Sequence, residues 1–182
     1  KGSFIGPNVV LDKDVEENPF VGTQGLELSF LEGTPPTDVY RDTTFDIIVD
    51  LHNRGALDIT KGTARLNIPL LFEADESSKP IEIISGKENF PGGEVGQVRW
   101  EGIAVKKTTV RADTPQKASV QVCYESNVLS QPEVCVRPRS GSDGIIEGEC
   151  NVGKKTFSGG QGGPISVVSV TENVIKISDT EN

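Results

Sequence analysis

The chain has 182 residues and a net charge of −9, and 35% of its residues are hydrophobic while only 5% are aromatic. A negative field of this size repels nucleic acids and anionic membranes, so we expect no nucleic-acid partner. The sequence contains no run of about 18 apolar residues, so we expect no direct membrane insertion in this segment. The length fits one domain with extensions, because a single sandwich takes about 100 residues.

Residues 1–22 are predicted to form an N-terminal extension. It contains an acidic loop with alternating carboxylates at Asp12, Asp14, Glu16 and Glu17. This spacing resembles the first part of a calcium loop, but the glycine and the distant glutamate of an EF-hand are missing. We therefore interpret the loop as solvated, with Ca²⁺ binding as the alternative, and we expect no other cofactor.

Strand patterns begin at Gly25 and continue to Pro138. Apolar residues alternate with polar ones in several runs, which is the period of a strand with one buried face. The alternating apolar residues are Leu26, Leu28, Phe30, Phe45, Ile47, Val49, Leu51, Ala64, Leu66, Ile68, Leu70, Val98, Trp100, Val120, Val122, Tyr124, Val134 and Val136. A short apolar strand is also expected at Ile81–Ile84. About seven strands separated by turns predict an all-β, immunoglobulin-like antiparallel β-sandwich over residues 23–138.

After Pro138 the composition changes, and residues 139–182 are predicted to form a Gly-rich linker and a C-terminal strand. Gly-rich sequence at 139–144 and 158–163 is typical of flexible linkers. The β-prone segment that follows could complete the sheet of a neighbouring subunit. Its candidate residues for such strand donation are Ile165, Val167, Val168 and Val170. The alternatives are that this segment folds back on its own body or begins a next domain.

Three cysteines are candidates for disulfide bonds. A hairpin folded near Leu129 would place Cys123 opposite Cys135, and a bridge there would stabilise the fold by roughly 3 kcal/mol. A Cys135–Cys150 bridge, which would tie the tail to the body, is the alternative. One cysteine stays unpaired unless it pairs outside this chain. Disulfide use indicates an oxidising compartment.

Catalytic and metal-binding patterns are weak in this sequence. His52 is the only histidine, and the chain has no C-x-x-C pair, no G-x-S-x-G motif and no H-E-x-x-H motif. A zinc site needs about four ligands with close spacing, and general-base chemistry relies most often on histidine. We therefore expect a protein that is not an enzyme. Trp100 is interpreted as a core anchor, with sugar stacking as the alternative.

Residues 45–55, followed by Pro91-Gly92-Gly93 and Val98-Arg99-Trp100, resemble the adhesion-related CARDB class of immunoglobulin-like domains. A wider stretch is similar to surface proteins of uncultivated archaea. Its matching motifs are Gly22–Phe30, Cys123-Tyr124, Val134–Val136 and Gly160–Ile165, and the similarity covers residues 22–170. The resemblance implies an extracellular, cell-surface location and a modular structural part, and it carries over no catalytic residues.

Two functions from different classes follow as expectations. The first is a non-enzymatic structural subunit of an extracellular assembly, such as a filament or sheath, joined by β-strand donation between subunits. The second is an adhesion module, or a carbohydrate- or protein-binding module, of a larger surface protein. The expected partners are other copies of the chain or other surface proteins.

Overall fold

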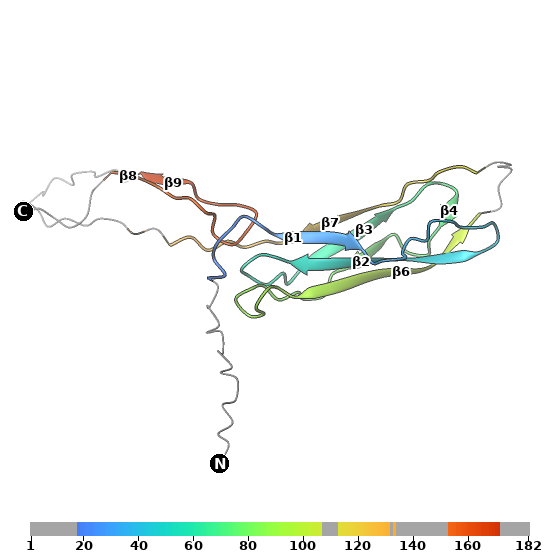
Figure 1. Cartoon of the computed structure of the whole chain (residues 1–182), viewed down its shortest axis with the longest axis horizontal. Coiled ribbons are helices and arrows are strands. Elements are labelled where there is room, and N and C mark those ends of the chain that lie inside the picture. Colours follow the sequence, from blue (N-terminus) through green and yellow to red (C-terminus); the bar gives the residue numbers. More distant parts are fainter. Residues whose placement is uncertain (1–17, 107–112, 132, 134–152, 172–182) are drawn as a thin grey trace, which may run out of the picture.

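The computed structural model describes residues 18–106, 113–131, 133 and 153–171. Within these residues the chain forms strands and turns without any helix, as Figure 1 shows. The strands are β1 (Leu26–Phe30), β2 (Thr44–Asn53), β3 (Gly62–Asn67), β4 (Phe72–Glu73), β5 (Ser78–Pro80), β6 (Val95–Val105), β7 (Ser119–Tyr124), β8 (Lys154–Thr156) and β9 (Ser169–Thr171). All paired strands run antiparallel. The all-β fold predicted from the sequence is confirmed.

The first sheet has the order β1-β2-β6-β4, with β2 at its centre. The alternation of β2 buries Ile47, Val49 and Leu51 on one face. Its pairing with β6 shifts near Asp46, which lies opposite both Glu101 and Gly102. This is a β-bulge, and the Asp46 carboxylate accepts the Gly102 N–H at 2.9 Å.

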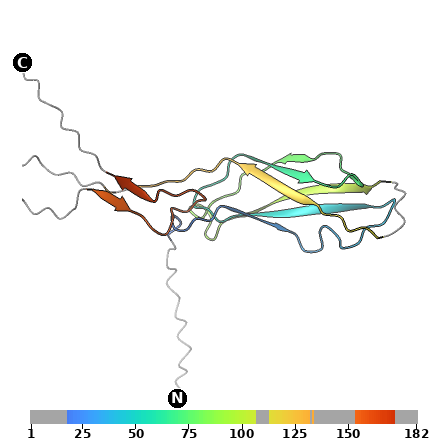
Figure 2. The same ribbon diagram turned by 90° about the horizontal axis from the view of Figure 1, so that it is seen from above.

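The second sheet has the order β5-β3-β7 and packs against the first. Figure 2 shows β7 passing across the strands of the first sheet. Side chains from both sheets form one core, in which β3 contributes Ala64 and Leu66 while β6 contributes Val98 and Trp100. Trp100 is 1% exposed, so the prediction that it anchors the core is confirmed. The apolar faces of β2, β3 and the middle of β6 are therefore buried between the sheets. The expectation of one buried face does not hold for the edge strand β1, where Leu28 and Phe30 are 43% and 44% exposed.

Two predicted strand segments end differently from the expectation. The alternating run that includes Leu70 was expected to continue, but β3 ends at Asn67 and Leu70 is 92% exposed. Pro69 explains this end, because proline has no N–H to donate to the sheet. In the run Ile81–Ile84, the Ile81 N–H donates to the Gly62 carbonyl at 3.0 Å and so continues the pairing with β3, but β5 ends at Pro80. Ile84 pairs with Ile59 through an isolated bridge and is buried in the core, because the chain turns inward there.

A third, two-stranded sheet lies beyond one end of the sandwich. It consists of β8 and β9, with Lys155 opposite Val170. The molecule is elongated, with this hairpin at one pole and the loop that joins β1 to β2 reaching towards the other (Figure 1). We call the pole next to the hairpin, where β1 begins and β2 and β7 end, the base of the sandwich. The part of the chain that the structure describes has no helix that could cross a membrane.

Candidate functional site

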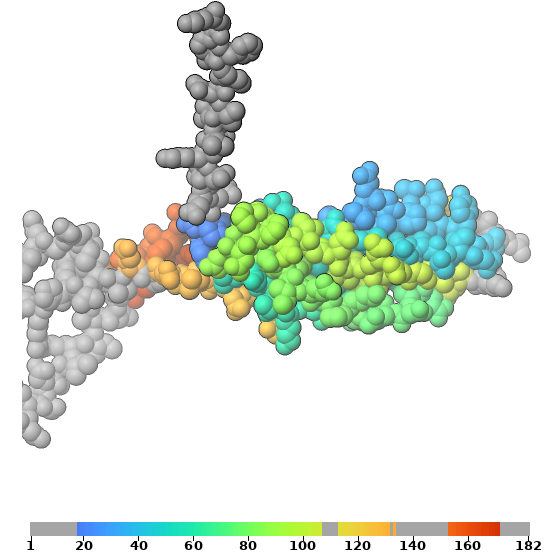
Figure 3. Space-filling view, turned by 90° about the horizontal axis from the view of Figure 1, so that it is seen from below, coloured from blue at the N-terminus to red at the C-terminus, as the bar shows by residue number. Residues whose placement is uncertain are grey.

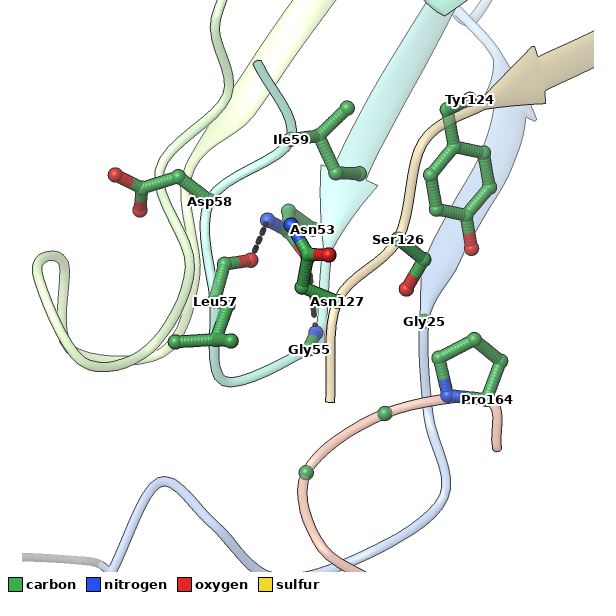
Figure 4. Close-up of a pocket in the computed structure, with 12 residues that line it drawn as sticks. Gly25, Asn53, Gly55, Leu57, Asp58, Ile59, Tyr124, Ser126, Asn127 and Pro164 are labelled. Carbon is green, nitrogen blue, oxygen red and sulfur yellow. Dashed lines mark hydrogen bonds between the residues drawn. The ribbon is translucent and has the colours of Figure 1, made fainter. Parts of the chain in front are cut away.

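The base of the sandwich is organised by one buried side chain, Asn53. It is 1% exposed and occupies the last position of β2. Its Nδ2 donates to the Leu57 carbonyl at 3.0 Å and to the Ile84 carbonyl at 3.1 Å, and its Oδ1 accepts the Gly55 N–H at 3.0 Å. Figure 4 shows this side chain inside the turn that follows β2. The Asn-x-Gly sequence is therefore a turn closed by an amide, which holds the backbone of residues 55–57 at the base.

A loop from the hairpin lies against this turn. We call residues 158–164 the glycine loop; it leads from β8 towards β9. The Gly159 carbonyl accepts the Gly22 N–H at 2.6 Å, and Gly162 donates to the Gly22 carbonyl at 2.9 Å. The Gly162 carbonyl accepts the Ala56 N–H at 2.6 Å. The loop is thus bonded both to the segment before β1 and to the turn after β2. Figure 3 shows the first of these contacts, where the blue segment lies beside the orange-red one.

Only glycine fits at the centre of this contact. Gly162 has a φ of +72°, and a Cβ there would lie 2.6 Å from the Ala56 Cβ and 2.6 Å from the Pro19 carbonyl oxygen. A Cβ on Gly163 would lie 2.5 Å from a methyl carbon of Val128. Both glycines are buried. The close approach of two backbones, rather than flexibility, therefore accounts for these residues.

We call the surface that receives the glycine loop the socket, and its members belong to three separate stretches of chain. They are Pro19, Phe20, Gly22, Gly25, Ala56, Tyr124 and Val128. The Tyr124 hydroxyl accepts the Leu26 N–H at 3.2 Å, which joins the end of β7 to the start of β1. Pro164 lies below the Tyr124 ring in Figure 4, beside Gly25. The socket thus contains residues at the ends of both sheets, which the bond between Tyr124 and Leu26 joins at the base.

The structure differs here from the expectation of a flexible linker. The sequence predicts that residues 158–163 hold the C-terminal strand away from the body, but they lie in contact with it. Glycine-rich sequence is equally typical of a linker and of a close backbone contact, and the composition does not separate these two cases. The one sequence signal for a contact is that Pro164 directly follows four glycines among five residues.

The strand-donation candidates lie directly after the glycine loop. Ile165 and Val168 are 70% and 68% exposed. Val167 does not pair with a strand; its N–H donates to Gln161 Oε1 at 2.7 Å and its carbonyl accepts Gln161 Nε2 at 3.0 Å. Val170 belongs to β9 and pairs with Lys155. The segment therefore presents apolar side chains to solvent, while part of its backbone bonds within the hairpin.

The pole opposite the base carries a broad hollow of about 720 Å³. Its lining residues combine prolines and aromatic rings with a few charged groups: Pro35, Pro36, Thr37, Asp38, Val39, Tyr40, Arg41, Phe45, Leu71, Phe72, Val105, Asp113, Thr114, Pro115, Gln116 and Ala118. Phe45 and Phe72 pack edge to face, with ring centroids 5.2 Å apart. Tyr40 is 74% exposed at this pole. The hollow is concave, as ligand sites usually are, and polar and apolar groups contribute almost equally to its lining.

One carboxylate near the base has a shifted pKa. Glu94 accepts the Ser85 N–H at 2.7 Å. This bond, followed by one from the Ser85 side chain, lowers the pKa of Glu94 below its ordinary 4.5, although burial and the charge of Asp58 oppose the change. Asp58 in turn accepts the Gly86 N–H and an Asn89 amide hydrogen. Both carboxylates therefore hold the loop of residues 85–94 by accepting its backbone and side-chain donors.

The remaining predicted site residues are placed as follows. Cys123 is exposed on β7 and forms no disulfide with any residue that the structure describes, while Cys135 and Cys150 lie outside these residues, so the disulfide pairing stays a prediction. The acidic loop with Asp12, Asp14, Glu16 and Glu17 also lies outside them. His52 donates from Nε2 to the Gly92 carbonyl at 3.0 Å. Within the described ranges, no group of three or more His, Cys, Asp or Glu side chains is placed to share a metal ion.

Comparison with known proteins identifies no counterpart of this site. The chain matches no protein-family model. It shows no significant similarity to a curated protein or to a solved structure.

Proposed function

We propose that this chain is a non-enzymatic structural subunit of an extracellular, cell-surface assembly such as a filament or sheath. The observation that carries the proposal is the β8–β9 hairpin, which extends beyond the sandwich and exposes Ile165 and Val168. A two-stranded sheet is marginally stable alone in water and gains from a further strand or an apolar cover. Another copy of the chain supplies both, through β-strand pairing at the hairpin edge.

The strand order supports an immunoglobulin-like sandwich as the body of this subunit. In that fold, strands A, B, E and D form one sheet, and C, F and G form the other. The order β1-β2-β6-β4 corresponds to A-B-E-D, and β3-β7 corresponds to C-F. The cell-surface location follows from the resemblance to archaeal surface proteins and remains part of the proposal.

Substitution of the exposed apolar residues tests the assembly. The double variant Ile165→Lys/Val168→Lys places two charges on the hairpin, where they would be desolvated at a joint between subunits. We expect the purified protein to change from oligomers or fibres to monomers, measured by sedimentation velocity and electron microscopy. If this variant assembles like the wild type, or if the wild type is monomeric at all concentrations, the proposal is wrong.

A matched control separates this effect from the change in net charge. Ile83 and Leu70 are 65% and 92% exposed and lie on the body rather than on the hairpin. Ile83→Lys/Leu70→Lys adds the same two positive charges. Assembly should therefore persist in this control, and the unfolding midpoints of both double variants should lie close to that of the wild type.

The hollow at the opposite pole favours a second candidate, an adhesion or carbohydrate-binding module. The exposed Tyr40 ring can stack against a sugar, while Asp38 and Arg41 can bind its hydroxyls. Screening the protein on a glycan array tests this function, with Tyr40→Ala as the variant. A ligand that the wild type binds and Tyr40→Ala does not, in a protein that stays monomeric, would favour adhesion over assembly.

A further inference from the structure

We infer that the glycine loop of one copy enters the socket of a second copy, so that exchanged loops form the joint between subunits. This inference rests on the proposed function and names its joint. The loop and the socket are two separate surfaces of the same chain. Any second copy therefore presents a socket with the same hydrogen-bonding groups, and exchange of an identical element costs little free energy.

The contact is specific enough to serve as a joint. Its three backbone hydrogen bonds are 2.6–2.9 Å long and join Gly22 and Ala56 to the loop. Gly162 and Gly163 are buried where a Cβ would overlap the socket. Shape and hydrogen bonds therefore select this loop sequence, and a loop with larger residues at these positions would be excluded.

The chain length between the two surfaces permits exchange. Residues 134–152 separate Glu133, near the end of the sandwich sequence, from Gly153, which precedes β8. A segment of this length spans up to roughly 60 Å when extended, at about 3.3 Å per residue. The glycine loop can therefore reach the socket of a neighbouring subunit as well as its own.

Exchange also brings the exposed apolar residues beside the loop close to further surfaces. Ile165 and Val168 are exposed when the loop occupies the socket of its own chain, and the same loop–socket contacts in an exchanged pair leave them so. An exchanged pair also brings two bodies and two hairpins together at the base, and contacts between them, which a single chain lacks, can cover both side chains. A second copy is thus the partner that we infer for the loop.

An engineered disulfide tests whether the contact lies within one chain or between two. A Cβ built on Gly163 lies 3.7 Å from the Val128 Cβ, which is the separation of a disulfide bond. Val128→Cys/Gly163→Cys also removes the methyl group that would overlap the new side chain. Isotopically labelled and unlabelled chains of this variant are refolded together and oxidised, and the linked peptides containing positions 128 and 163 are identified by mass spectrometry.

We expect linked pairs that combine a labelled with an unlabelled peptide, in a protein that is oligomeric. If oligomers form but every linked pair comes from a single isotope, the exchange is wrong while the proposed assembly stands. If the protein is monomeric and the bond forms within one chain, both are wrong. The two ideas therefore fail in distinguishable ways.

A second variant decides the outcome if the engineered bond does not form. Gly162→Val places a side chain against Ala56 and should reduce the oligomer fraction at least tenfold. Gly159→Ala is the matched control, because Gly159 also has a positive φ, of +89°, but a Cβ there meets nothing within 4 Å. Oligomers that persist in Gly162→Val would show that the glycine loop is not the joint.

Discussion

At the scale of the residue, a single amide organises the base of the sandwich. Asn53 makes three hydrogen bonds to backbone groups of the turn after β2 and of Ile84. A buried polar group that loses its partner costs about 1–3 kcal/mol, which is more than the bond contributes when formed. Replacement of Asn53 by a residue that lacks a side-chain amide should therefore destabilise the fold.

We predict that Asn53→Ala lowers the free energy of unfolding by roughly 3 kcal/mol, because two carbonyl groups and one N–H lose their partner. Chemical denaturation followed by the fluorescence of Trp100 measures this change. Asn89→Ala is the matched control, since Asn89 is exposed and its amide donates to Asp58. We expect Asn89→Ala to lower the free energy of unfolding by less than about 1 kcal/mol. An equal loss in both variants would contradict the conclusion that Asn53 organises the base.

A second prediction at this scale concerns pH. The pKa of Glu94 is lowered in the folded protein, so its ionised form stabilises the fold above the ordinary pKa of 4.5. This contribution is lost as the pH falls through the lowered pKa. The wild type should therefore be more stable than Glu94→Gln at pH 7, and the difference should shrink as the pH falls below 4.5. A difference in unfolding midpoint that grows on acidification would contradict this.

At the scale of the element, the loop of residues 85–94 connects the buried residue Ile84 to the start of β6. Gly92 and Gly93 both have a positive φ, of +85° and +84°. A Cβ on Gly92 meets nothing within 4 Å, whereas a Cβ on Gly93 would overlap the Asn53 carbonyl oxygen. Two adjacent glycines thus have the same backbone conformation but different surroundings.

We predict that Gly92→Ala costs roughly 1–2 kcal/mol, which is the penalty of a left-handed conformation. Gly93→Ala should cost at least about 2 kcal/mol more, because the backbone of β2 has to move. Thermal unfolding of the two variants measures the difference. Equal costs would show that conformation alone, and not the contact with Asn53, makes glycine necessary here.

The strands themselves could largely be predicted from alternation. β2 was expected with Phe45, Ile47, Val49 and Leu51 on one face, and the last three are buried in the core. Alternation is a local property, so a short window of sequence contains it. The extra residue of β6 at Gly102 and the inward turn at Ile84 depend on packing between distant segments, which the same window does not contain.

At the scale of the whole molecule, the net charge of −9 acts against assembly. Copies of an acidic chain repel one another, and salt screens this repulsion over a length of about 8 Å at 0.15 M. The proposed joint consists of backbone hydrogen bonds and apolar contacts, which salt does not weaken. We therefore expect added salt to favour assembly, because it weakens the repulsion between copies but not the contacts that join them.

We predict that assembly strengthens as the NaCl concentration rises from about 0.01 M to about 0.15 M. Sedimentation velocity at matched protein concentrations measures the oligomer fraction at each salt concentration. Ile165→Lys/Val168→Lys should stay monomeric at both. Dissociation of the wild type on addition of salt would indicate a joint made of ion pairs instead.

The sequence by itself determined the all-β class, the core faces of the main strands and the burial of Trp100. These follow from alternation along the chain and from the partition of apolar side chains away from water. Only the tertiary structure decided that residues 158–164 contact the body, because Gly162 lies against Ala56, a residue more than 100 positions earlier in the chain. Close backbone approach between such distant segments leaves no periodic pattern in the sequence, and a glycine required by contact looks the same there as a glycine in a linker.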